Sequence, residues 1–165
     1  MAQVTLRGNP FQTSGELPAV GSEAPSYSVV SSDLSEITSE SLRGQKVVLN
    51  IFPSIDTPTC AASVREFNAR AAGRDDTVVL CVSEDLPFAA GRFCGTEGIE
   101  NVKTGSGFRG DFADAFGVRL AEGPLAGLMA RAVVVVDENG VVTHTQLVDE
   151  IADEPDYDAA LAALS

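Results

Sequence analysis

Three cysteines, Cys60, Cys81 and Cys94, are the residues of this sequence best suited to covalent chemistry. A thiolate is a nucleophile and a metal ligand, whereas a cysteine packed in a core is inert. The three are widely spaced and none belongs to a C-x-x-C pair, which disfavours a zinc knuckle and a dithiol redox motif. Their odd number also disfavours the disulfide framework of a small secreted protein. The surroundings of each cysteine therefore decide its role.

Cys60 follows a strand-to-helix junction that favours a thiolate. Thr57 is a good N-cap residue, and Pro58 suits the first position of a helix. Cys60 is then the third helical residue, where the backbone N–H lacks an intrahelical partner and the helix dipole favours negative charge. A thiol in that field is converted more readily into its nucleophilic form.

The same helix predicts where the thiol points. Val64, Phe67 and Ala71 follow Cys60 at helical spacing and form an apolar stripe over residues 58–72. We therefore expect the thiol at the bottom of a pocket rather than on open surface. The alternative is that Cys60 is only the first core residue of that stripe, but its place just after Pro53 and Thr57 favours a site.

The other candidate residues have weaker contexts. Cys81 lies within the apolar run 78–82, which predicts a core residue. Cys94 is followed by Gly95 and Gly98, so we expect it at a helix end that frays easily, although a packed core position is the alternative. His144 is the only histidine of the sequence. It lies in a predicted strand, and we interpret it as an exposed strand residue with no link to Cys60.

Alternating strands and helices predict an α/β fold of the thioredoxin-like class. The first 20 residues predict a hairpin whose turn is Gly8-Asn9-Pro10, and 28–30 predicts an edge strand. Further strands are expected at 46–52, 77–83, near 102, 132–136 and 141–147, the last two joined by a turn at 137–140. Helices are expected at 58–72, 86–93, 112–116 and 155–164, the last beginning at Pro155.

Length and composition restrict the class of protein. The 165 residues suit one domain, 1–165, that begins with the hairpin at 1–20. The formal net charge of −13 is spread along the chain and disfavours binding to nucleic acid or anionic lipid. Because no stretch of about 18 apolar residues occurs and the first residues do not resemble a secretory signal, we expect no membrane segment and a cytoplasmic location.

Pro53, Thr57 and Cys60 match the pattern P-x-x-x-T/S-x-x-C, which resembles the active-site motif of the peroxiredoxins. The longer string NIFPSIDTPTCAASVREFN is similar to one branch of them, the bacterial thiol peroxidases, which are atypical two-cysteine peroxiredoxins. DLPFAAGRFCG around Cys94, ARAVVVVDENG around Arg131 and QLVDEIADEPDYDAAL near the end resemble the same branch. The resemblance covers essentially the whole chain.

This resemblance implies a thioredoxin fold, a homodimer and a peroxidase that needs neither a metal nor an organic cofactor. It implies that Cys60 attacks hydrogen peroxide or an organic hydroperoxide to give a sulfenic acid. It implies Cys94 as the resolving cysteine, which forms an intramolecular disulfide with Cys60 that thioredoxin reduces. Thr57 and Arg131 would activate the site, and Pro53 would line its pocket.

Two other functions use similar chemistry. A thiol–disulfide oxidoreductase acting on proteins would require a second cysteine three residues after Cys60, and that position is Ser63. A redox sensor would use the same thiol but would pass its oxidation to a partner protein. Turnover with a reducing system indicates an enzyme, whereas a trapped mixed disulfide with a protein target indicates a sensor.

Overall fold

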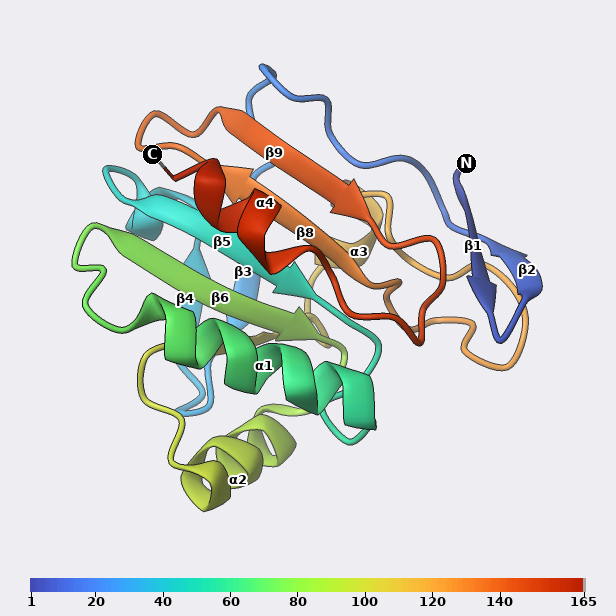
Figure 1. Cartoon of the computed structure of the whole chain (residues 1–165), viewed down its shortest axis with the longest axis horizontal. Helices are drawn as coiled ribbons and strands as arrows, with labels where there is room; N and C mark the ends of the chain where they lie inside the picture. The colour runs from blue at the N-terminus through green and yellow to red at the C-terminus, as the bar shows by residue number, and fades with distance from the viewer. Residues whose placement is uncertain (165) are drawn as a thin grey trace.

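The computed structural model describes residues 1–164, and within them a seven-stranded sheet forms the centre of the molecule (Figure 1). The strand order is β4-β3-β7-β6-β5-β8-β9. Strands β5, β6 and β7 run parallel, and β8 pairs antiparallel with β5. The strands are β3 (Ser28–Val30), β4 (Glu36–Thr38), β5 (Lys46–Ile51), β6 (Thr77–Ser83), β7 (Lys103–Ser106), β8 (Ala132–Val136) and β9 (Val142–Leu147).

Both faces of the central strands are buried, as their continuous apolar runs predict. One face packs against helices α1 (Pro58–Ala71) and α4 (Tyr157–Ala162), which lie together in front of the sheet in Figure 1. Phe112 and Phe116, at helix α3 (Phe112–Ala115), pack against the opposite face. Alternate residues of β5 therefore enter two separate cores.

The register of β8 against β5 determines what lies beside the end of β5. Ala132, the first residue of β8, pairs with Ile51, the last residue of β5. Because the strands are antiparallel, Arg131 lies at the sheet edge where β5 continues into Phe52 and Pro53. The chain then leads within a few residues to Cys60 in the first turn of α1.

A hairpin of β1 (Gln3–Leu6) and β2 (Asn9–Gln12) lies at the same end of the molecule (Figure 1). Thr5 forms backbone bonds with Asp149 and Ile151, at 2.7 and 2.8 Å. Val4 is buried in a small apolar cluster with Leu120, Ala130 and Ile151. The hairpin is therefore fixed to the segment that follows β9.

Most of the predicted elements are confirmed. The strands at 46–52, 77–83 and 132–136, and the helix at 58–72, are present within one residue of the predicted bounds. The hairpin turn is Arg7-Gly8 rather than Gly8-Asn9-Pro10, and both of its residues have positive φ, at 52° and 83°. The strand at 28–30 was wrongly predicted to be an edge strand. On its outer side it pairs with β4. Neither β4 nor the short 3₁₀ helix Glu40–Leu42 was predicted from the sequence.

Two helices differ from prediction. Helix α2 (Pro87–Glu97) continues past Gly95, so Cys94 lies within the helix rather than at its end. The helix ends at Gly98, whose φ of 67° is left-handed and whose N–H donates to the Cys94 carbonyl. Helix α4 begins after Pro155, because the Asp156 carboxylate accepts a bond from the Ala159 N–H and makes Asp156 the N-cap.

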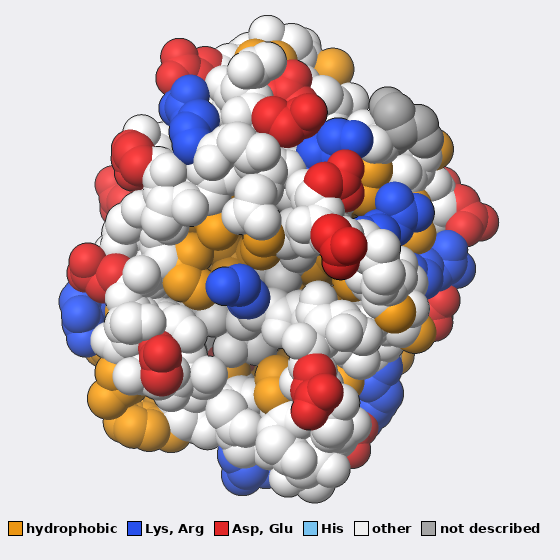
Figure 2. Space-filling model, turned by 90° about the vertical axis from the view of Figure 1, so that its left-hand side faces the viewer, with side chains coloured by type: hydrophobic (Ala, Val, Ile, Leu, Met, Phe, Trp, Pro, Cys, Tyr) orange, Lys and Arg blue, Asp and Glu red, His pale blue; other side chains and the backbone are white. Residues whose placement is uncertain are grey.

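Acidic and basic side chains are interspersed on the surface. Figure 2 shows this on the end of the molecule opposite the β1–β2 hairpin, where neither sign of charge forms a continuous field. None of the helices in residues 1–164 has the length and apolar character needed to cross a membrane.

The carboxylate of Glu150 makes hairpin docking dependent on pH. It accepts bonds from Gly8 N–H, the Thr5 hydroxyl and Ala152 N–H, at 2.9, 3.0 and 2.9 Å. These backbone and hydroxyl donors lower the pKa of Glu150 to about 2. A lowered folded-state pKa stabilises the folded form above the ordinary pKa of about 4.3, and this stabilisation is lost as pH falls toward about 2.

We therefore predict that the hairpin loosens between about pH 4 and pH 2. Glu150→Gln should loosen it already at neutral pH. Hydrogen exchange of the Gly8 and Ala152 amides, followed against pH, measures the effect. Glu100→Gln, at an exposed position without a side-chain bond to the hairpin, is the control. Unchanged amide protection in Glu150→Gln would contradict the assignment.

Candidate active site

The loop between β5 and α1 places Cys60 in the first turn of the helix. Thr57 is the N-cap, with φ −105° and ψ 148°, and Pro58 occupies the first position, as predicted. The Thr57 hydroxyl does not cap the helix, however. It donates to the Ser54 carbonyl at 2.9 Å, so it closes the loop instead. The first turn is held by the Ala61 N–H, which donates to the Thr57 carbonyl at 3.0 Å.

The structure brings Cys60 and Arg131 together, although 71 positions separate them in sequence. Arg131 Nη2 donates to Cys60 Sγ at 3.2 Å, and Arg131 Nε donates to the Ile151 carbonyl at 2.9 Å. The exposed fraction is 0% for Cys60 and 1% for Arg131. The guanidinium and the sulfur therefore meet out of contact with bulk water.

Burying Arg131 requires an explanation, because an isolated cation in a protein interior is strongly unfavourable. A guanidinium stays protonated in proteins. Within residues 1–164, none of the ion pairs involves Arg131, and its Nη1 has no hydrogen-bond partner. The Cys60 sulfur and the Ile151 carbonyl are the groups that the guanidinium contacts, and Nη1 is left as a free donor beside the sulfur.

Polar side chains join the first turn of α1, which contains Cys60, to strand β5. Ser63 Oγ donates to the Cys60 carbonyl at 2.7 Å and accepts a bond from Asn50 Nδ2 at 3.1 Å. Asn50 Nδ2 also lies 3.7 Å from Cys81 Sγ. Cys81 is buried in β6, as predicted, and burial raises its pKa to about 12. It therefore stays a thiol at neutral pH.

Asp85, just after β6, organises the loop from the other side. Its carboxylate accepts bonds from Ser54 Oγ at 2.8 Å, Ile55 N–H at 2.7 Å and Ser83 Oγ at 2.7 Å. One side chain therefore binds both the loop that follows β5 and the end of β6. Asp85 was not predicted from the sequence. The available signal was its position two residues after a buried parallel strand, at the sheet edge where β5 also ends.

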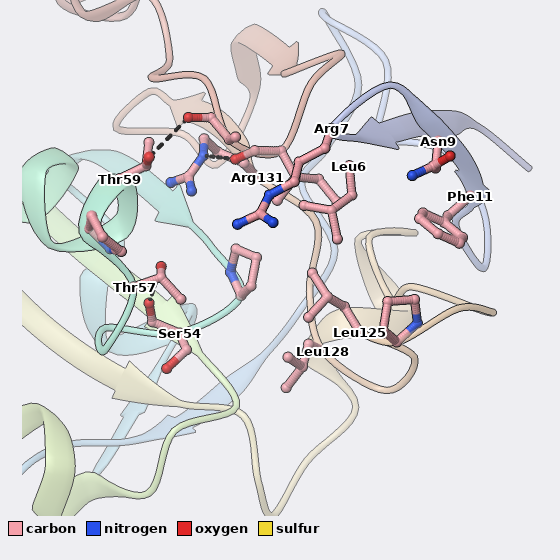
Figure 3. A pocket seen from close by; sticks show the side chains of 15 residues that line it. Leu6, Arg7, Asn9, Phe11, Ser54, Thr57, Thr59, Leu125, Leu128 and Arg131 are labelled. Atoms are coloured by element: carbon pink, nitrogen blue, oxygen red, sulfur yellow. Dashed lines mark hydrogen bonds between the residues drawn. The ribbon is translucent and has the colours of Figure 1, made fainter.

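A cavity of about 520 Å³ opens beside Arg131 (Figure 3). Pro53, Thr57 and Arg131 line it on the side of the sheet, and Cys60 lies buried behind them. The opposite wall is formed by the hairpin and by the segment that precedes β8, with side chains such as Phe11, Leu125 and Leu128. No part in the site was predicted for the hairpin from the sequence.

Cys94 lies away from this cavity. It contributes to a second cavity of about 510 Å³, lined mainly by residues of 31–45 and 99–104, which shares no lining residue with the first. Partial burial raises the pKa of the Cys94 thiol. The structure therefore does not bring Cys94 to Cys60 in this conformation.

His144 lies in β9, as predicted, but it is half-buried rather than exposed. It pairs with Val135, near the far end of β8 from Arg131, so it has no place in the site. Among residues 1–164, no cluster of three or more histidine, cysteine or carboxylate side chains is placed to hold a metal ion.

The chain is similar to known proteins over nearly its whole length. The redoxin family model matches residues 19–161. A thiol peroxidase of Mycobacterium tuberculosis is 60% identical over 99% of both chains, and one of Corynebacterium glutamicum is 57% identical over the full length of both. The chain belongs to the thiol peroxidases of the redoxin family. It is thus an enzyme, a peroxidase of the peroxiredoxin type.

A solved structure supports the fold assignment of this thiol peroxidase. The crystal structure of a peroxiredoxin-like protein from Aquifex aeolicus superposes with a TM-score of 0.94 at 39% identity. It covers 99% of this chain and 96% of its own. The thioredoxin-like fold is therefore confirmed over nearly the whole chain, including the N-terminal hairpin region.

We predict that Asp85→Asn slows peroxide reduction by about tenfold or more. An amide has the same size, but it replaces one of the two acceptor oxygens by an NH2 donor, so it cannot accept all three bonds that the carboxylate accepts. An unpaired polar group costs about 1–3 kcal/mol. The rate of Cys60 oxidation, followed by stopped flow, measures the effect. Asp33→Asn is the control, since the Asp33 carboxylate likewise accepts hydrogen bonds, two of them from Ser35, but in an exposed turn. Equal rates in both variants would remove Asp85 from the site.

Proposed function

We propose that this thiol peroxidase reduces hydrogen peroxide and organic hydroperoxides at Cys60. The observation that carries the proposal is the buried Arg131 guanidinium, which donates to Cys60 Sγ at 3.2 Å and keeps Nη1 unpaired. A buried unpaired donor in a native structure indicates a missing partner. A peroxide oxygen beside the sulfur would supply that partner.

The first step forms an S–O bond and breaks the O–O bond. The Cys60 thiolate attacks one peroxide oxygen, and the other oxygen leaves as hydroxide or alkoxide and takes up a proton. Negative charge thereby moves from sulfur to the leaving oxygen, toward which Nη1 would donate, and losing such a donor costs about 3–4 kcal/mol in other enzymes. The Thr57 hydroxyl, at the cavity wall, would orient the peroxide. Cys60 becomes a sulfenic acid.

We assign the second step to Cys94. Its thiol condenses with the sulfenic acid, giving a disulfide and water, and an external dithiol such as thioredoxin then reduces the disulfide by exchange. A disulfide requires Cα atoms within about 7 Å, so α2 has to move or unwind. The loose packing of α2 favours such a movement, because Pro87 is the only residue of α2 that is buried, whereas α1 buries six.

The cavity beside Arg131 supports organic substrates in addition to hydrogen peroxide. Its walls are mainly apolar, and a cavity of about 520 Å³ is within the range of sites for small organic molecules. The carbon part of a hydroperoxide would lie against the hairpin while its O–O bond approaches Cys60. No metal or organic cofactor is required, because the sulfur provides both electrons.

We further propose a homodimer, as the family resemblance implies. Exposed apolar side chains of the α2 region, Leu86 and Phe88, are 52% and 66% exposed and are suited to a protein contact.

We predict that Cys60→Ser abolishes peroxide turnover and that Cys81→Ser retains most of it. Serine is not a nucleophile of comparable strength, whereas Cys81 is held as a buried thiol. Consumption of hydroperoxide with thioredoxin, thioredoxin reductase and NADPH measures both. Loss of turnover in a correctly folded Cys81→Ser protein would show that the nucleophile is wrongly assigned.

We also predict that a stoichiometric amount of peroxide joins Cys60 to Cys94 within one chain. Peptide mapping should find this link in a monomer-sized band on a non-reducing gel. Hydrogen exchange should become faster over residues 86–98, because α2 leaves its place. A disulfide-linked dimer band, or a link between Cys60 and Cys81, would instead identify another resolving residue.

A further inference from the structure

The charged side chains around the cavity differ from those of the whole protein. The chain carries 24 acidic and 11 basic residues, yet the ionisable residues that line the cavity are Arg7 and Arg131, with no carboxylate among them. Arg131 is engaged with Cys60 and the Ile151 carbonyl. Arg7 is therefore the cation available to a bound molecule.

Arg7 is held in an unusual backbone conformation. It occupies the first position of the two-residue β1–β2 turn, where its φ of 52° is in the left-handed region. Glycine, asparagine and aspartate are the usual residues there, because other side chains are strained at positive φ. The turn is nevertheless fixed, since Glu150 accepts bonds from Gly8 N–H and the Thr5 hydroxyl. The backbone from which the Arg7 side chain extends is therefore set by a docked turn.

The Arg7 guanidinium has free donors. Figure 3 shows its side chain reaching from the hairpin into the cavity, toward the side on which Arg131 lies. Within residues 1–164 it forms no ion pair, and no side-chain hydrogen bond involves it. Glu150, the carboxylate that binds the same turn, directs its oxygens to Gly8, Thr5 and Ala152. A planar guanidinium with free donors binds carboxylates well.

We propose that Arg7 binds the carboxylate of an organic hydroperoxide while Arg131 and Cys60 bind its O–O bond. The carbon chain between the two groups would lie along the apolar wall formed by Leu6, Leu125 and Leu128. Arg7 is then a specificity-determining residue that favours acidic hydroperoxides over neutral ones. This inference rests on the proposed reduction of hydroperoxides at Cys60.

The test compares a series of ω-hydroperoxyalkanoic acids of increasing chain length with their methyl esters. For each pair, kcat/KM is measured in the thioredoxin-coupled assay. At the best chain length the acid should exceed the ester by about tenfold in the wild type, the equivalent of one well-placed charge-assisted contact. The ratio should fall to about one in Arg7→Met and below one in Arg7→Glu, whereas Arg7→Lys should keep part of the preference.

Because the ratio is taken within each variant, a loss of folded protein does not alter it. Arg74→Met is the matched control, since Arg74 is exposed in the loop between α1 and β6 and does not line the cavity; it should keep the wild-type ratio. Equal rates for acid and ester in the wild type would overturn the Arg7 inference while leaving hydroperoxide reduction intact. A wild-type ratio retained in Arg7→Met would overturn it as well. Failure to consume any hydroperoxide would instead reject the proposed function.

Discussion

The contact between the Arg131 guanidinium and the Cys60 sulfur is the constraint on which the rest of the site depends. Both groups are withdrawn from water, so the buried guanidinium depends on the sulfur and on the Ile151 carbonyl as its hydrogen-bond partners. The sheet maintains their separation, because Arg131 precedes β8, Cys60 follows β5, and the two strands pair in register up to Ile51 and Ala132. The segment after β9 orients the guanidinium through the Ile151 carbonyl. The approach of the guanidinium to the sulfur is thus a consequence of strand pairing rather than of the α1 helix alone.

The site combines a fixed part with a weakly held part. Asp85 binds the loop before Cys60 and the end of β6, and Ser63 and Asn50 bind the first turn of α1 from behind. Helix α2 begins only two residues after Asp85, but it buries little of its surface. Its contacts with the rest of the site include the exposed Arg92–Asp56 ion pair, and such pairs contribute little to stability. This division suits the proposed reaction, in which Cys60 stays in place while Cys94 moves to it.

The elements that depend on local sequence were predictable, and those that depend on tertiary contacts were not. Long apolar runs predicted β5, β6 and β8, and the Thr57-Pro58 pair predicted the start of α1 and hence the place of Cys60. The strand β4 is short and mixed in character, so nothing in its own residues distinguishes it from a loop. The hairpin turn was misplaced because Gly8-Asn9-Pro10 has ordinary turn composition, whereas the docked structure places Arg7 in a left-handed conformation and Pro10 in a strand. Asp85 and the hairpin acquire their roles only when distant segments meet.

In the proposed function, the N-terminal hairpin contributes to substrate choice and the central sheet to the peroxide chemistry. The sulfur, the guanidinium and the loop before Cys60 belong to the central sheet, and the proposed reaction there involves an O–O bond whatever is attached to it. The outer wall of the cavity, by contrast, comes from the hairpin and from the segment before β8, against which the Phe11 ring packs at Gly123. Glu150 joins the two parts, because it holds the turn and directly precedes Ile151, whose carbonyl orients Arg131. A change in the hairpin therefore alters the surroundings of the Cys60 sulfur in two ways. It changes the shape and charge of the cavity, and it changes the orientation of the Arg131 guanidinium.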